Sequence, residues 1–459
     1  MAIDVRKSQD LTASHNILVP SSFRPRAILC AVLLLPALAH SQSATDSVRT
    51  VTLTEALAMA THASPALASG KAAVSSARAS RLTVTGEYLP SLGIAASVGR
   101  GTTVQGANGV TNGMPVASSV RPLDDFYGSG ISASIPVFTG GRRGADRRSA
   151  DARQTAADAG LVATEYDVRL ATKEAYFNVL RANDLVDVAS AQVAEAERAM
   201  RDAESRLRAG TTTRSDVLRA RVALAAARDA LATAGSARST SQFDLARVIG
   251  SDSPVGAAPV ADDTIPLPGS RDSLVSSAVT GAPLARAAAA NARSADAAIG
   301  AAEAQFLPTA LASGGYGWLE QRSVNPRPVG GWTVQMGISY PLFNGFQREA
   351  AVSRAKADAE AARSARLDTE RGVRADAVRA YNDATVAAQR IGFARDAVAA
   401  AHEDLRVQEL RYRAGASTFL DEVTSQLNVV QAETSLVVAR YDYEIALAML
   451  ERALGRELR

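Results

Sequence analysis

Two long runs without proline constrain this chain more than any other feature of its sequence. No proline occurs between Pro136 and Pro254, and none follows Pro341. Both runs are rich in Ala, Arg, Glu and Asp, and they lack the residue that breaks helices. The stretch from Gly144 to Arg208 alone predicts a helix of about 65 residues, or ~98 Å at 1.5 Å per residue. A compact domain does not accommodate such a helix, so the sequence predicts an elongated, mainly helical protein.

Apolar residues recur every seven positions within these runs. This spacing is typical of a coiled-coil seam, and the neighbouring alanines allow helices to approach closely. The seam positions are Val186, Val193, Met200 and Leu207 in the first run, and Ile391, Val398, Leu405 and Tyr412 in the second. The sequence therefore predicts long helices packed side by side.

The two halves of the chain repeat one another. Pro65 and Pro90 have the same spacing as Pro283 and Pro308. Further along the chain, matching segments are Pro136-Val137-Phe138-Thr139-Gly140 with Pro341-Leu342-Phe343-Asn344-Gly345, and Arg206-Leu207-Arg208-Ala209-Gly210 with Arg411-Tyr412-Arg413-Ala414-Gly415. Agreement over so many landmarks indicates an internal duplication.

Each repeat is predicted to run helix, β-hairpin, very long helix, turn, helix. The first repeat spans 50–254, with a helix near 55–86, a hairpin at about 89–138, a long helix at 144–208 and a helix at 215–249. A linker at 255–270 follows. The second repeat spans 271–459, with a hairpin at about 308–343, a long helix at 346–413 and a helix at 417–455.

The first 39 residues are predicted to be a secretory signal peptide. Arg24 and Arg26 precede a short apolar run, and Ala37-Leu38-Ala39 supplies the small residues of a cleavage site. Removing residues 1–39 takes away four basic and two acidic residues, which lowers the net charge from +3 to +1. The basic balance therefore gives no support for nucleic-acid binding. Cys30, the single cysteine, lies inside the predicted signal, so disulfides and cysteine metal clusters are excluded.

The segments between the paired prolines alternate with a period of two. From Trp332 to Tyr340, and from Ile131 to Val137, apolar residues alternate with small or polar ones over roughly ten residues, the length of a transmembrane strand. Aromatic residues make up only 5% of the chain. Six that gather near these segments are predicted to lie at a membrane interface, namely Tyr88, Tyr127, Tyr316, Trp318, Trp332 and Tyr340. The alternative is two ordinary hairpins that cap a helical bundle.

Four strands cannot close a barrel, and lipid does not tolerate open strand edges. Two copies of the chain would supply eight strands and three would supply twelve. An eight-stranded barrel is filled by its own side chains, so a conducting pore favours three or more copies.

With these motifs in place, the sequence resembles the outer-membrane efflux protein family, the TolC-like channels. The resemblance rests on Leu53-Thr54-Glu55-Ala56-Leu57, the repeated Leu-Pro and Pro-Val/Leu-Phe-x-Gly junctions and the Arg-Ala-Gly turns. It implies a homotrimer with a 12-stranded β-barrel in outer-membrane lipid and a coiled-coil α-helical barrel in the periplasm. It also implies docking onto a periplasmic adaptor protein and an inner-membrane transporter of the RND, ABC or MFS type.

The resemblance also implies roles for the two helix-turn-helix tips. The docking residues would be Arg208, Gly210, Thr211, Arg413, Gly415, Ala416 and Ser417. The tips would converge on a closed gate, in which Tyr412 pairs with Asp216 of a neighbouring hairpin and Asp421 lines the constriction. Ser417 replaces an arginine that holds the gate in the family. Because Asp216 and Asp421 also stand where helix N-caps need acceptors, capping and gating both stay open for them.

No enzyme is expected. The sequence has no Gly-rich phosphate loop in a strand-to-helix context, no G-x-S-x-G, no HExxH and no paired metal ligands. No catalytic, cofactor or metal site is predicted. The remaining alternative is an exported, non-conducting coiled coil that spans the periplasm as a structural protein.

Overall fold

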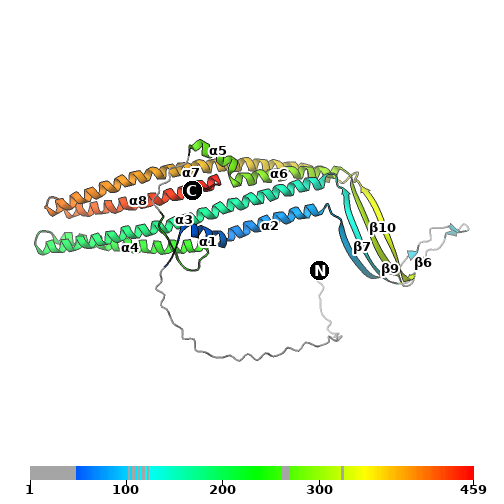
Figure 1. The fold of residues 1–459 in the computed structure, drawn as a ribbon, viewed down its shortest axis with the longest axis horizontal. Coiled ribbons are helices and arrows are strands. Elements are labelled where there is room, and N and C mark those ends of the chain that lie inside the picture. Colours follow the sequence, from blue (N-terminus) through cyan, green and yellow to red (C-terminus); the bar gives the residue numbers. More distant parts are fainter. Residues whose placement is uncertain are drawn as a thin grey trace, which may run out of the picture. The chain divides into compact units, whose positions relative to one another are not determined.

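The computed structural model describes residues 48–101, 104–105, 110–111, 114–115, 119–120, 124–260, 269–321 and 325–458. These residues belong to one compact unit (Figure 1). The predicted signal peptide, residues 1–39, lies outside the described residues.

The helices follow the predicted duplication closely. Each pair of equivalent helices has the same or nearly the same length: 11 residues in α1 (Leu53–Ala63) and α5 (Arg271–Gly281), 22 and 21 in α2 (Pro65–Gly86) and α6 (Pro283–Glu303), 67 in α3 (Arg142–Arg208) and α7 (Gln347–Arg413), and 36 in α4 (Arg214–Ile249) and α8 (Phe419–Leu454). The short 3₁₀ helix η1 (Ala304–Phe306) follows α6. The long helices therefore extend about 100 Å each at 1.5 Å per residue.

The single helix expected near 55–86 is in fact two helices. Ser64 is extended, its side chain caps the second helix by accepting a hydrogen bond from the Leu67 amide, and Pro65 occupies the first helical position. Proline fits there because it lacks an amide hydrogen that the first turn would leave unsatisfied in any case. The other helix boundaries differ from the predicted ones by at most two residues.

The helices lie side by side in one row (Figure 1). The α2 and α4 helices pack along different parts of α3, and α6 and α8 pack between α3 and α7. Two shorter helices thus accompany each long one, as their summed lengths indicate. Much of the contact surface between these helices consists of buried alanines, among them Ala199 and Ala203 of α3 and Ala220 and Ala227 of α4. Alanine allows the close approach that holds these helices together without large side chains.

The predicted linker at 255–270 begins with a strand instead. Strand β8 (Val255–Ala257) pairs in parallel with β1 (Arg49–Val51). The buried hydroxyl of Tyr176 donates to the Ala258 carbonyl at 2.6 Å and also reaches the Val51 carbonyl. This packing on α3 orders a segment whose composition alone indicated a loop.

Four long strands form one antiparallel sheet in the order β10-β9-β7-β2. They are β2 (Ser91–Gly101), β7 (Asp124–Phe138), β9 (Thr309–Gln321) and β10 (Asn325–Ser339). Two short pairings lie between β2 and β7: β3 (Val104–Gln105) with β6 (Ser119–Val120), and β4 (Val110–Thr111) with β5 (Met114–Pro115). Figure 1 shows the long strands beyond the ends of α2, α3, α6 and α7, at the opposite end from the tips of the two helical hairpins.

Candidate functional site

The register of the sheet separates its side chains by character. Residues paired directly across antiparallel strands point to the same face, so one face carries Leu92, Ile94, Ala96 and Val98 of β2, Ile131, Ala133 and Ile135 of β7, Ala310, Ala312, Tyr316 and Trp318 of β9, and Trp332, Val334, Met336 and Ile338 of β10. The opposite face carries mainly serine and glycine, including Ser132, Ser134, Ser313, Gly315 and Gly337. The apolar side chains are exposed, with Leu92, Ile94, Trp332 and Val334 each more than 75% accessible. One chain therefore leaves an apolar sheet face uncovered.

The six aromatic residues predicted at the membrane interface fall into two groups. Tyr316, Trp318 and Trp332 lie on the apolar face, as does Tyr127, which pairs with Val98. Tyr88 and Tyr340 lie instead where helices meet strands, and both are exposed.

An arginine occupies the start of each long helix at this junction. Arg143 lies 4.7 Å from the centroid of the Tyr88 ring and donates to the carbonyls of Glu87 and Val137. At the equivalent place in the second repeat, the buried Arg348 lies 5.0 Å from the centroid of the Phe306 ring and donates to the Pro341 carbonyl. These contacts fix the end of each hairpin onto its helix.

The two tips at the other end of the helices share one backbone design. Gly210 and Gly415 end the long helices with φ of 76° and 73°, a conformation that favours glycine. In both turns the residue after the glycine donates its amide back to the helix, Thr211 to the Arg206 carbonyl and Ala416 to the Arg411 carbonyl. The exposed docking candidates Arg208, Thr211, Arg413 and Ala416 lie on these turns or next to them.

Asp216 and Asp421 both complete capping boxes. In the first tip, the hydroxyls of Thr213 and Thr212 each donate to Asp216 at 2.8 Å, and Arg219 lies 3.2 Å from it. Burial acts to raise the pKa of Asp216, but these hydrogen bonds and Arg219 outweigh it and lower the pKa. In the second tip, the backbone and side chain of Thr418 donate to Asp421 and lower its pKa. Within the described part of one chain, both carboxylates therefore act in helix capping, and Asp216 has Thr212 and Arg219 as additional partners.

Tyr412 packs inside its own chain, where it does not meet Asp216. Its ring lies 4.4 Å from the guanidinium of Arg206 and 5.7 Å from the Phe419 ring. In the described part of the chain, its buried hydroxyl has no hydrogen-bond partner. Ser417 donates to the Gln408 carbonyl at 3.4 Å. The structure of a single chain thus brings together Tyr412 and α3, and leaves the pairing with a neighbouring Asp216 as a prediction.

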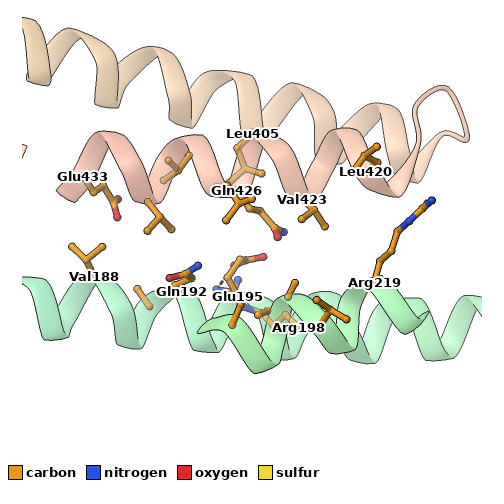
Figure 2. Close-up of a pocket in the computed structure, with 18 of the residues that line it drawn as sticks. Val188, Gln192, Glu195, Arg198, Arg219, Leu405, Leu420, Val423, Gln426 and Glu433 are labelled. Carbon is orange, nitrogen blue, oxygen red and sulfur yellow. Dashed lines mark ion pairs between the residues drawn. The ribbon is translucent and has the colours of Figure 1, made fainter. Parts of the chain in front are cut away.

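A groove of about 730 Å³ opens between the two helical hairpins, behind the tips. It is lined by apolar side chains of α3, α4, α7 and α8, with polar groups among them (Figure 2). Figure 2 shows Glu195 of α3 and Gln426 of α8 on opposite walls of this groove. Glu195 pairs with Arg198 at 2.5 Å, and His402 lies 2.9 Å from Glu433.

Sequence reasoning missed one group near this groove, the carboxyl of Glu422. Its Oε2 atom is buried without a hydrogen-bond partner in the described chain, and burial raises its pKa to about 7. The equivalent residue of the first repeat is the buried Val217. Aligning the two repeats residue by residue would have found this exchange of a core valine for a carboxylate.

The fold and the duplication match those of a known family. A family model described as "Outer membrane efflux protein" matches residues 56–251 and again residues 274–456. The chain belongs to the outer membrane efflux protein family. Because the two matched segments follow one another and together cover most of the chain, they also confirm the internal duplication.

Relatives and solved structures agree with this assignment. The chain is 29% identical to Protein CyaE of Bordetella pertussis over 349 residues, which cover 74% of this chain and 70% of the relative. It is 24% identical to the outer membrane efflux protein BepC of Brucella suis over 353 residues, or 76% of each. Among solved structures, CusC has a TM-score of 0.77 at 18% identity and covers 93% of this chain and 99% of its own. The outer-membrane channel OprN has a TM-score of 0.76 at 22% identity and covers 88% and 89%.

These comparisons confirm the predicted fold class, a mainly helical protein with a β-barrel portion and two repeats. Family and fold are those of channels. In the described part of the chain, no helix is long and apolar enough to cross a membrane. The same residues contain no group of three or more His, Cys, Asp or Glu that could hold a metal ion.

Proposed function

We propose that this protein is the outer-membrane channel of a tripartite efflux or type I secretion system. It passively conducts substrates from a periplasmic adaptor and an inner-membrane transporter to the exterior. The observation that carries this proposal is the four-stranded sheet, which has one apolar face, one face of small and polar residues, and an unpaired edge at each side in the described residues.

The two sheet edges support assembly into a closed ring. In the order β10-β9-β7-β2 every neighbouring pair is antiparallel, so β10 and β2 run in opposite directions. The β10 edge of one copy can therefore pair with the β2 edge of the next and continue the antiparallel pattern. Three copies give twelve strands with the apolar face toward lipid, which removes every edge from the membrane.

The helices support the same stoichiometry. Each chain contributes four columns of helix to the row. The long helices α3 and α7 form one column each, α2 and α4 together form a third, and α6 and α8 together form the fourth. Three copies would form a tunnel of twelve columns that continues the barrel across the periplasm. Each long helix of 67 residues extends about 100 Å.

The tips are proposed as both gate and docking site. They lie at the far end of the helices from the sheet (Figure 1), where a channel in the outer membrane would meet a periplasmic adaptor. The docking residues would be Arg208, Gly210, Thr211, Arg413, Gly415, Ala416 and Ser417. The gate would hold Asp216, Tyr412 and Asp421, and three carboxylates in a narrow pore favour cations.

Reconstitution tests the proposal. We expect the purified mature chain to be a trimer by mass and to conduct ions in planar lipid bilayers. A trimer or monomer that inserts no conducting unit would instead favour the non-conducting structural protein.

Charge reversal tests the gate. Because Asp216→Arg removes a carboxylate from the proposed constriction and disrupts its contacts, we expect single-channel conductance to rise several-fold. Asp229→Arg is the matched control, since Asp229 is exposed on the same helix but more than three turns away from the tip. Equal conductance in Asp216→Arg and the native channel would contradict a gate role for Asp216.

A further inference from the structure

The seam between the two helical hairpins, where α3 faces α8, contains a carboxylate whose equivalent in the first repeat is a valine. Val217 and Glu422 follow equivalent capping boxes, one residue after Asp216 and Asp421. Val217 is 8% exposed and packs among Ala199, Ala203 and Phe419. The same turn and capping box therefore form in the first repeat without a charged group at this position.

The tip-side ends of α7 and α8 contain other buried polar atoms that have no partners in the described chain. In addition to the Oε2 atom of Glu422, the Oε1 atom of Gln408, the hydroxyl of Tyr412 and the Nε2 atom of Gln426 are buried and make no hydrogen bond in the described chain. Ser425, next to Gln426, donates to Asp404 at 2.5 Å, which places this part of α8 against the end of α7. Unsatisfied groups of this kind weaken a packed interface, because each has lost its hydration without gaining a partner.

Charged groups of two other helices act on the carboxyl of Glu422. Glu409 of α7 and Glu195 and Asp202 of α3 repel its charge, while Arg206 of α3 attracts it. Most of the arginines nearby already have other partners. Arg413 pairs with Glu409, and Arg198 pairs with Glu195. Arg219 of α4 pairs with Asp216, and Arg206 lies over the Tyr412 ring.

We propose that Glu422 is a proton-operated latch between the two helical hairpins, closed when its carboxyl is neutral and released when the carboxyl loses its proton. The neutral acid can remain in the seam beside the other carboxylates. The ionised acid is repelled by three carboxylates against the single attraction of Arg206, and its buried Oε2 atom has no hydrogen bond, so it favours a wider seam in which water reaches that atom. The movement itself does not depend on the proposed function, but its consequence, a wider tip and higher conductance, rests on it.

The direction of the pH effect follows from the pKa. Burial raises the pKa of Glu422 from 4.5 to about 7 in the packed seam, and a solvated carboxyl in the open seam would return to its ordinary value. The packed form is therefore fully stable below pH 4.5, loses stability as the pH rises to about 7, and changes no further above it. Because Glu422 is only partly buried and solvent screens its charge, we expect a change of roughly tenfold in the packed-to-open equilibrium.

A distance measurement tests the latch without any conduction. Spin labels on cysteines introduced at the exposed positions Arg201 of α3 and Asn428 of α8 report the width of the seam. The mature chain has no native cysteine if it begins after residue 39. In trimers diluted with unlabelled chain, we expect the wide population to grow roughly tenfold between pH 5 and pH 8. Glu422→Gln keeps the size of the side chain without its charge, so it should hold the narrow distance at both pH values.

Two control variants separate Glu422 from other titrating groups. His402 lines the groove behind the tips and lies 2.9 Å from Glu433. Glu403 is an exposed carboxylate of the same hairpin, paired with Arg406. Both His402→Gln and Glu403→Gln should keep the pH response. A response that survives in Glu422→Gln, or that disappears only in His402→Gln, would overturn the proposal.

Conductance is the second readout. We expect the native channel to conduct more at pH 8 than at pH 5 and Glu422→Gln to show no such rise. If the chain does not conduct at all but its seam still widens with pH, the proposed function fails and the latch stands. If it conducts with a seam of constant width, the latch fails and the proposed function stands.

Discussion

The two tips of this protein have nearly the same backbone and different side chains. Each begins with a left-handed glycine after a 67-residue helix and ends with a threonine capping box that starts a 36-residue helix. The side chains differ at six of the twelve equivalent positions from Arg206 to Val217 and from Arg411 to Glu422. Three of these differences bear on packing between the hairpins: Leu207 against Tyr412, Arg214 against Phe419, and Val217 against Glu422.

This comparison separates the residues that the turn itself requires from the side chains that occur in only one of the two tips. Glycine and the capping threonine are present in both tips because the backbone requires them. The aromatic pair and the buried carboxylate are found in the second tip alone, where they pack against α3 of the first hairpin. In this contact between the two hairpins, the second tip therefore supplies the large side chains and the first hairpin supplies the surface on which they pack.

The largest expected effect comes from the aromatic pair. Phe419 is 3% exposed and packs against Tyr412 and Val217, so Phe419→Ala should destabilise the packed tips by about 3 kcal/mol. The equivalent Arg214→Ala removes an exposed side chain and should cost almost nothing. Hydrogen exchange of the tip amides measures both. Equal protection in the two variants would show that the tips do not differ in this way.

Exchanging the buried residues should change stability in opposite directions. Val217→Glu places a carboxylate in a cluster of alanines and Phe419, and we expect a loss of about 2 kcal/mol. Glu422→Val removes an unsatisfied buried group and should stabilise the packed tips by about 1 kcal/mol. The same exchange measurements at pH 7.5 report both variants. A loss of stability in Glu422→Val would mean that Glu422 makes favourable contacts in the assembled channel.

Much of this architecture was predictable because it repeats. Helix lengths followed from the proline-free runs, and the alternation from Trp332 to Tyr340 predicted the apolar sheet face that the register bears out. The turns at Gly210 and Gly415 followed from their local sequence. These features depend on periodicity and on backbone chemistry, which a single sequence displays directly.

Other features depend on contacts between distant segments. The strand β8 forms because Val255 and Ala257 meet β1 and Tyr176, which lie far away in the sequence. The packing of Tyr412 on Arg206 joins residues of different repeats. The buried position of Glu422 likewise requires knowing that α3 faces α8. Periodicity indicates which face of a helix is buried, and it does not indicate the partner.

The capping boxes should respond alike in the two tips. Thr213→Ala and Thr418→Ala each remove the hydroxyl that accepts from the amide of the third helical residue, Asp216 or Asp421. A lost N-cap costs about 1 kcal/mol, so amide protection in the first turns of α4 and α8 should fall by similar amounts. A much larger loss at one tip would show that its threonine has a role beyond capping.

The smallest expected difference concerns acid. Hydrogen bonds lower the pKa of Asp216 and Asp421 below the ordinary aspartate pKa of 3.8, so they stabilise the tips fully when the pH is above 3.8. This contribution is lost as the pH falls through the lowered pKa values. Asp216 has two additional partners, Thr212 and Arg219, so Asp216→Asn should remove more of the acid dependence of tip protection than Asp421→Asn does. Amide exchange between pH 3 and pH 5 measures this. Because Asn accepts hydrogen bonds without carrying charge, an equal response in both variants would show that Arg219 and Thr212 add nothing to the cap at the first tip.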